Sequence, residues 1–255
     1  MSSALEQYKI LKDLKSNYTD DLHIEIYQQV VHQNPDDADA HFNLGNAYHS
    51  AERYAEAIDP YQQAVRLKPD LELAYSRLGY AYTQLRQYEP AIQAFEAAIR
   101  LNPRGHIDRV NAGMAYFYIG KKSQAIAHLK EAARLNPDHE TAHYDMGVAY
   151  QNLGEYKEAV EAFRQAARLK PSNPDAHFQL GQAYTRLGRY QEAVEAFKKA
   201  VALKPDFIDA RFQLGHAYFK MGSHEAALKE YDDLKGRDKH RAEELYSLIR
   251  DPASR

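Results

Sequence analysis

The chain has 255 residues, of which 27% are charged and 44% hydrophobic, and its formal net charge is −3. Neither sign of charge accumulates in a long run, which argues against a nucleic-acid partner, and the absence of cysteine excludes disulfides and thiolate metal sites. No apolar run approaches the length of a membrane span, and the opening residues MSSALEQYK lack the apolar core of a secretory signal. We therefore expect a soluble, cytoplasmic protein without membrane insertion.

The first segment, residues 1–37, is expected to be a degenerate leading repeat that caps one end of the fold. Ile10, Leu11 and Leu14 keep a helical apolar stripe. Pro35 lies in register with prolines that recur later in the chain. A terminal repeat that departs from the pattern is typical of a cap.

From residue 38 the sequence repeats with a fixed period of 34 residues. Every repeat has Gly at position 8, Ala at positions 10 and 20 and Tyr at position 11, and five of the six repeats have Pro at position 32. The six repeats are residues 38–71, 72–105, 106–139, 140–173, 174–207 and 208–241, the last of them degenerate. A period of this length indicates a solenoid in which each repeat packs on its neighbours.

Each repeat is expected to form two helices. Positions 4, 7, 8 and 11, which are His41, Leu44, Gly45 and Tyr48 in the first full repeat, share one helical face, and a second stripe occupies positions 17, 20, 24 and 27. The polar break between them, residues 50–53 in the first full repeat, fits only an antiparallel turn, and Gly at position 8 allows a close approach of the two helices. The residue after each proline is expected to cap the next helix: Asp36, Asp70, Asp138, Ser172 and Asp206.

Three features depart from the pattern. The third repeat is entered through Arg104-Gly105, which predicts a looser junction. Pro60 falls inside an expected helix, where it removes one backbone hydrogen bond and either bends the helix or shifts its start. The last proline is replaced by Lys239, and residues 242–255 are expected to form a closing amphipathic helix and tail.

These positions resemble the tetratricopeptide repeat (TPR) family, whose 34-residue pattern has Leu-Gly at positions 7 and 8, Tyr at 11, Ala at 20, an aromatic residue at 24, Ala at 27 and Pro at 32. The resemblance implies an all-α, right-handed superhelical solenoid of antiparallel helix pairs. It also implies that positions 2, 5, 9, 12 and 13 of each first helix line a concave, peptide-binding surface. The family members that grip C-terminal carboxylates carry Lys at position 2, whereas this chain has Asp39, Asp175 and Asp209 there.

The resemblance therefore predicts a peptide-binding groove that is unusually apolar in the middle. The alternative is that neighbouring repeats or the terminal helices cover part of this stripe. The candidate groove residues are Phe42, Asn46, His49, Tyr80, Val110, Met114, Phe117, Tyr118, Tyr144, Val148, Phe178, Gln182, Arg186, Phe212 and Phe219.

We predict a non-catalytic protein-binding scaffold, adaptor or assembly chaperone without cofactor or metal. Its partner would be a protein or peptide that presents an apolar or amphipathic segment, since aromatic and Met side chains suit such a ligand. The principal alternative is a structural scaffold that associates with itself into a homo-oligomer.

One string suggests an enzyme. Residues His139-Glu140-Thr141-Ala142-His143 match the HExxH pattern of zinc hydrolases, and Glu161 is a nominal third ligand. The repeat register, however, puts His139 at or before the start of a helix and His143 at position 4, a packing position. We therefore regard a zinc-dependent hydrolase as the less favoured hypothesis.

Overall fold

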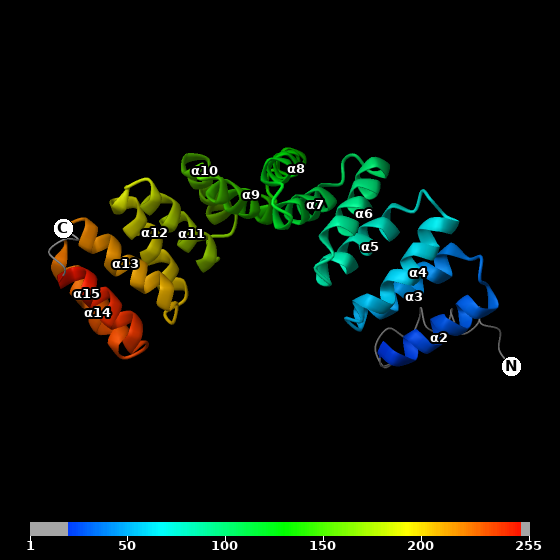
Figure 1. The fold of residues 1–255 in the computed structure, drawn as a ribbon, viewed down its shortest axis with the longest axis horizontal. Helices are drawn as coiled ribbons and strands as arrows, with labels where there is room; N and C mark the ends of the chain where they lie inside the picture. The colour runs from blue at the N-terminus through cyan, green and yellow to red at the C-terminus, as the bar shows by residue number, and fades with distance from the viewer. Residues whose placement is uncertain (1–19, 251–255) are drawn as a thin grey trace. The chain divides into compact units, whose positions relative to one another are not determined.

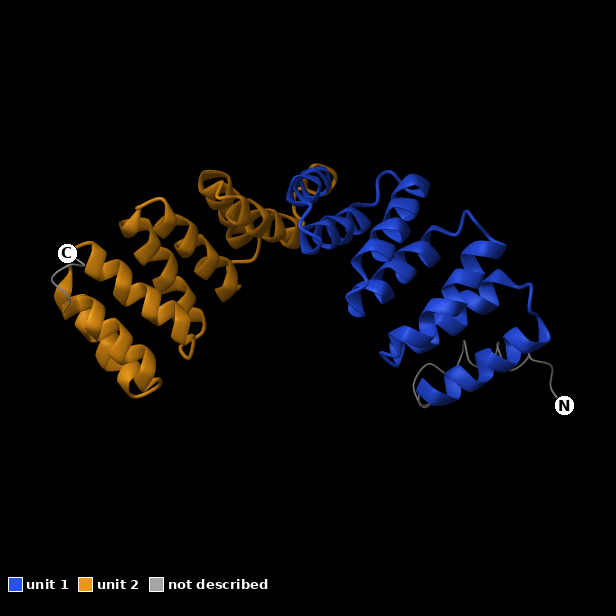
Figure 2. Ribbon diagram, in the orientation of Figure 1, with its two compact units in different colours: residues 1–131 blue, residues 132–255 orange. Residues whose placement is uncertain are grey.

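The structure is a computed structural model that describes residues 20–250. Within these residues it contains fourteen α-helices and no strand (Figure 1). Its contacts divide the chain into two compact units, residues 1–131 and 132–255, with the boundary inside α8 (Lys122–Leu135) (Figure 2). The stripe predicted at Ile10, Leu11 and Leu14 lies outside the described residues.

Each unit is a row of helix pairs packed side by side. The other helices of the N-terminal unit are α2 (Asp20–Gln33), α3 (Ala38–Ser50), α4 (Tyr54–Leu67), α5 (Glu72–Gln84), α6 (Tyr88–Leu101) and α7 (His106–Tyr118). Those of the C-terminal unit are α9 (Glu140–Leu153), α10 (Tyr156–Leu169), α11 (Pro174–Arg186), α12 (Tyr190–Leu203), α13 (Ile208–Lys220), α14 (His224–Lys235) and α15 (Lys239–Arg250). The predicted all-α array of antiparallel pairs is confirmed, and no helix in residues 20–250 combines the length and apolar character that a membrane crossing requires.

The glycine at position 8 sets the spacing within a pair. A Cβ atom added to Gly147 would lie 2.7 Å from the ring of Phe163, the residue at position 24 of the same repeat. The equivalent distance is 2.6 Å between Gly181 and Phe197. In these two repeats position 24 is a fully buried ring seated directly on the backbone of the first helix, which explains why no larger residue fits at position 8.

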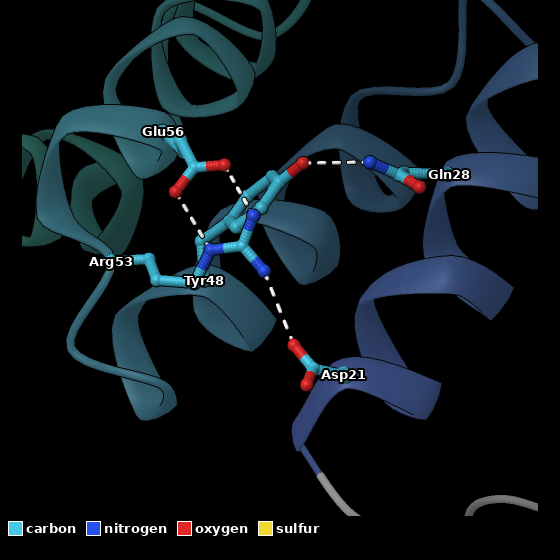
Figure 3. A network of polar contacts seen from close by, with 5 residues as sticks. All are labelled: Asp21, Gln28, Tyr48, Arg53 and Glu56. Carbon is cyan, nitrogen blue, oxygen red and sulfur yellow. Dashed lines mark hydrogen bonds and ion pairs between the residues drawn. The ribbon is translucent and has the colours of Figure 1, made fainter.

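The tyrosine at position 11 links neighbouring repeats. Its hydroxyl contacts the residue at position 25 of the preceding repeat: Gln62 donates to Tyr82 at 2.7 Å, and Arg164 donates to Tyr184 at 3.2 Å. Figure 3 shows the same arrangement at the start of the described chain, where Gln28 of α2 donates to Tyr48. There the guanidinium of Arg53 lies over the Tyr48 ring and pairs with Asp21 and Glu56, as Figure 3 also shows.

The first helices do not begin as the sequence suggested. The N-cap is one residue later than predicted, at Asp37 for α3, because Pro35 and Asp36 occupy the turn between Asn34 and Asp37. The Asp37 carboxylate accepts from the backbone amides of residues 39 and 40, at 2.9 and 3.2 Å. Pro60 lies inside an unbroken α4, and the start of that helix at Tyr54 keeps the repeat register.

The array closes with α15. Ala242 and Leu245 are fully buried, and Ile249 is nearly so. Leu245 takes the place that position 24 has in other repeats, since a Cβ added to Gly215 would lie 2.5 Å from its side chain. The helix begins at Lys239, three residues before the expected start of the closing segment.

Candidate functional site

The first helices of the N-terminal unit carry an exposed apolar surface. Leu73 and Tyr80 of α5 are 56% and 37% exposed, and Ile107 and Tyr118 of α7 are 59% and 55% exposed. These side chains occupy positions 2, 9 and 13, which share one side of each first helix. We call this surface, made of Leu73, Tyr80, Ile107 and Tyr118, the α5–α7 face.

A cavity of about 670 Å³ opens on this face. Leu73, Tyr80 and Ile107 supply its apolar wall, and the loop before α7, including Arg104 and Gly105, supplies another side. The cavity thus lies at the junction that the sequence suggested would be loose. Its polar lining comprises Glu72, Ser76, Arg77, Asn102, His106, Asp108 and Asn111. Burial, with a smaller contribution from the charge of Glu72, raises the pKa of Asp108.

Tyr80 is held in place from one side by other rings. Its ring centroid lies 5.1 Å from that of His49 and 6.1 Å from that of Tyr54. Burial, together with the charge of Arg77, lowers the pKa of His49, which favours the neutral imidazole in this cluster. Tyr118 is similarly stacked on Tyr88, at 4.8 Å. Rings anchored in this way present contact area at small entropic cost, which suits them to binding.

The C-terminal unit offers different chemistry on its first helices. A cavity of about 510 Å³ is lined entirely by hydrogen-bonding residues from α9, α11 and α13: Gln151, Gln182, Thr185, Arg186, Gln213 and His216. Gln182 and Arg186 were among the predicted groove residues. Gln213 was missed because position 6 was considered only as part of a carboxylate clamp. The prediction of a single apolar stripe therefore describes α5 and α7 better than it describes this unit.

Position 5 is largely a packing position. The ring of Phe178 lies 5.8 Å from that of Phe197, and the ring of Tyr144 lies 5.7 Å from that of Phe163, so both side chains turn toward position 24 of their own repeat. Phe42 meets Tyr61 in the same way, at 6.0 Å. These three predicted groove residues are half-buried.

Three predicted groove residues are buried, and their expected exposure was wrong. Val110, Phe212 and Phe219 are only 5%, 7% and 4% exposed. Val110 and Phe212 are at position 5, which packs inward, and Phe212 and Phe219 share a core cluster with Leu245 and Ile249 of the closing helix. The alternative that a terminal helix covers part of the stripe thus holds in repeat 6.

The remaining predicted groove residues are not buried. Six of them are half-buried: Asn46, His49, Met114, Phe117, Val148 and Gln182. Arg186 is exposed. Asn46 accepts a hydrogen bond from the Tyr61 hydroxyl at 2.9 Å, which commits its amide oxygen to packing within repeat 1.

The HExxH string has a structural explanation. His139 is the N-cap of α9, and its Nδ1 atom accepts from the Ala142 amide at 3.2 Å. His143 Nε2 lies 3.0 Å from the Pro137 carbonyl oxygen, as His177 Nε2 lies 3.0 Å from that of Pro171. Among the described residues, no group of three or more His, Cys, Asp or Glu side chains is placed to hold a metal ion. The two histidines are thus engaged with the backbone at the start of the helix.

Comparisons with known proteins agree on the fold. The family model of the cilia and flagella-associated protein 70 C-terminal domain, a TPR domain, matches residues 3–245. The crystal structure of MamA is 27% identical, with a TM-score of 0.63, over 66% of this chain and 92% of MamA. YrrB, described as a TPR protein with an unusual peptide-binding site, is 24% identical, with a TM-score of 0.63, over 72% of this chain and 95% of YrrB.

A third structure is the C-terminal part of a TPR repeat-containing protein from Cytophaga hutchinsonii. It is 21% identical, with a TM-score of 0.71, over 84% of this chain and 90% of that one. No curated protein sequence matches the chain significantly. TPR arrays are generally non-catalytic scaffolds for protein interactions. With the family model spanning nearly all of its repeats, the chain belongs to the TPR family and shares the domain type of the cilia and flagella-associated protein 70 C-terminal domain.

Proposed function

We propose that this protein is a non-catalytic scaffold or adaptor that binds an apolar or amphipathic segment of a partner protein on the α5–α7 face. The observation that carries the proposal is the exposure of four apolar side chains on α5 and α7. Leu73, Tyr80 and Ile107 line one cavity, and Tyr118 lies on the same helices outside it. An apolar surface of this kind, rimmed by polar groups, marks a binding site on many proteins.

The face favours an amphipathic ligand over a purely apolar one. Leu73 and Ile107 give apolar contact at position 2 of successive first helices, while Arg77 and Glu72 supply charges of both signs at the edge of the cavity. An amphipathic segment can place apolar side chains in the cavity and keep its polar side toward these charges. YrrB is described as having a peptide-binding site, and at 24% identity that likeness supports the fold alone.

The test is affinity capture of partners from native lysate with quantitative mass spectrometry. The test variant is Tyr80→Ser/Ile107→Ser, and the matched control is Leu101→Ser/Leu203→Ser, which removes two apolar side chains, 42% and 43% exposed, from second helices. We expect the test variant to lose a defined set of partners that the control keeps. Circular dichroism should show equal helicity in both variants.

Retention of every partner by the test variant would place binding elsewhere and contradict the proposal. Loss of the same partners in both variants would indicate non-specific apolar capture. A partner segment identified by cross-linking then allows binding to be measured directly with the purified pair.

A further inference from the structure

A buried carboxyl group lines the cavity on the α5–α7 face. Asp108, at position 3 of α7, is only 6% exposed, and it is one of the residues around the cavity of about 670 Å³, which we call the α5–α7 cavity. Within residues 20–250, no lysine, arginine or histidine forms an ion pair with it. A buried carboxylate without a cation is energetically unfavourable, so this group requires an explanation.

Two groups of α5 face the same carboxyl. Glu72 and Ser76 are four residues apart, so they share one side of their helix, and both line the α5–α7 cavity. Burial raises the pKa of Asp108, the Ser76 hydroxyl lowers it, and the charge of Glu72 raises it further. Ser76 Oγ is itself buried and has no hydrogen-bond partner at normal distance in the described part of the chain. We call Glu72, Ser76 and Asp108 the acidic cluster.

The acidic cluster opposes stability when it is considered alone. Its two carboxyl groups repel each other, and burial disfavours the charged form of Asp108. Buried groups perturbed in this way beside a cavity are candidates for binding sites. A cation that enters the cavity would pair with both carboxylates, and it would also supply the donor that Ser76 Oγ lacks.

The positive groups of the same cavity do not satisfy the acidic cluster. Arg77 and Arg104 are exposed members of the lining, and the charge of Arg77 acts on His49 of α3. His106, the first residue of α7, is the remaining basic member. None of the three basic residues is among the groups that shift the pKa of Asp108. The need for a cation is therefore met from outside the protein.

The apolar wall of the cavity indicates which cation fits. Leu73, Tyr80 and Ile107 line the same cavity as the acidic cluster. A lysine side chain packs its methylene groups along an apolar surface while its ammonium group stays at a polar end. That ammonium group has three donors on one atom, which suits three separate acceptors, whereas the planar fork of arginine suits a single carboxylate.

We propose that the α5–α7 cavity takes a lysine side chain of the partner segment, whose ammonium group pairs with Asp108 and Glu72 and donates to Ser76. The inference rests on the proposed function, since it specifies a residue that the amphipathic segment presents. The apolar residues of that segment then contact Leu73 and Ile107.

The experiment uses the full-length protein and three libraries of fluorescein-labelled twelve-residue peptides with blocked termini. Apolar and polar residues are varied with helical spacing, other basic residues are left out, and one central residue is lysine, norleucine or glutamate. Norleucine keeps an aliphatic chain like that of lysine but lacks the ammonium group. We expect the best lysine peptide to bind at least about tenfold more tightly than its norleucine counterpart, and the glutamate counterpart to bind most weakly.

Two matched variants connect this preference to the cavity. Asp108→Asn removes the buried charge with little change in size, and it should abolish the difference between the lysine and norleucine peptides. Asp145→Asn is the control, because Asp145 of α9 is also a buried acid, 9% exposed, but does not line the cavity. The control should keep the full difference.

Thermal unfolding separates recognition from packing. Asp108→Asn should melt at the same temperature as the wild type or higher, since it removes a buried charge that has no cation. Equal binding of the lysine and norleucine peptides, no binding of any lysine peptide, or an unchanged lysine preference in Asp108→Asn would each overturn the inference. A norleucine peptide that binds as well as the lysine peptide but is lost in Tyr80→Ser/Ile107→Ser would leave the proposed function intact.

Discussion

The buried ion pair between α13 and α14 gives a sharp test of how the last repeat is stabilised. Arg211 Nη1 lies 3.0 Å from Glu230 Oε2 and 2.9 Å from Asp233 Oδ2. The Arg211 and Glu230 side chains are only 10% and 11% exposed, whereas Asp233 is 49% exposed. Arg211→Met would keep much of the aliphatic packing but leave a buried carboxylate without its cation. Breaking such a pair from one side costs about 3–5 kcal/mol.

The cost should depend on pH. Burial raises the pKa of Glu230 from 4.5, and the neighbouring Arg211 opposes that rise. A carboxyl whose folded pKa exceeds its unfolded pKa binds more protons in the folded state, so stability falls as pH rises between the two values. Removing Arg211 raises the folded pKa further and extends this window upward. The loss of stability in Arg211→Met should therefore be smaller at pH 5 than at pH 8.

Hydrogen exchange of the α13 and α14 amides gives the local free energy of opening, which suits an array whose repeats can unfold separately. The series is the wild type, Arg211→Met, Glu230→Leu and the double variant, each at pH 5 and pH 8. Replacing both partners with apolar groups should recover most of the loss. A loss in Arg211→Met that is equal at the two pH values, or a double variant no more stable than this single one, would refute the reasoning.

Three further predictions concern packing, the HExxH string and self-association. Gly147→Ala should lower the free energy of unfolding by about 1–3 kcal/mol, because the new methyl group meets the Phe163 ring, and Phe163→Leu in the same chain should recover part of this in urea titrations. His143→Ala should cost about 1 kcal/mol through its bond to the Pro137 carbonyl. Protein purified without a histidine tag should hold no stoichiometric zinc, and zinc that disappears in His143→Ala would revive the hydrolase hypothesis. Light scattering across a dilution series should give the monomer mass; a dimer abolished by Tyr118→Ser would instead assign the α5–α7 face to a second copy.

The pairing of helices could be predicted from the sequence because it depends on local residue size. Gly113 meets Leu129 in repeat 3, as Gly79 meets the larger Phe95 in repeat 2. The two helices of each repeat therefore approach closely wherever a small residue at position 8 faces a large residue at position 24. The turn that precedes each first helix could also be predicted from the sequence. Pro at position 32 followed by a polar residue is typical of the centre of a β-turn, and that reading places the cap at position 34, as at Asn173.

The accessible surface could not be predicted in the same way. Phe219, at position 12, has the sequence position of an open groove residue, yet it is buried in one cluster with Leu245 and Ile249 of α15. The register of α15 depends on tertiary packing after the repeat pattern has ended. Of the three glutamines that line the C-terminal cavity, Gln182 was predicted, whereas Gln151 and Gln213 were not. The three occupy different positions of the repeat and line one cavity only when successive first helices are placed together.

The positions that hold the array together are separate from those that differ between the α5–α7 cavity and the glutamine-lined cavity of the C-terminal unit. The packing positions are 8, 11 and 24, where Gly, Tyr and a large residue are buried or bridge repeats. At positions 2, 9 and 13 the side chain can vary at little cost to packing. Because a repeat contacts mainly its neighbours, such variation changes binding locally. A substitution that abolishes binding but leaves the protein fully stable therefore identifies a recognition residue. A substitution that lowers both binding and stability identifies a packing residue. By this criterion Tyr80 and Ile107 should behave as recognition residues, and Phe163 should not.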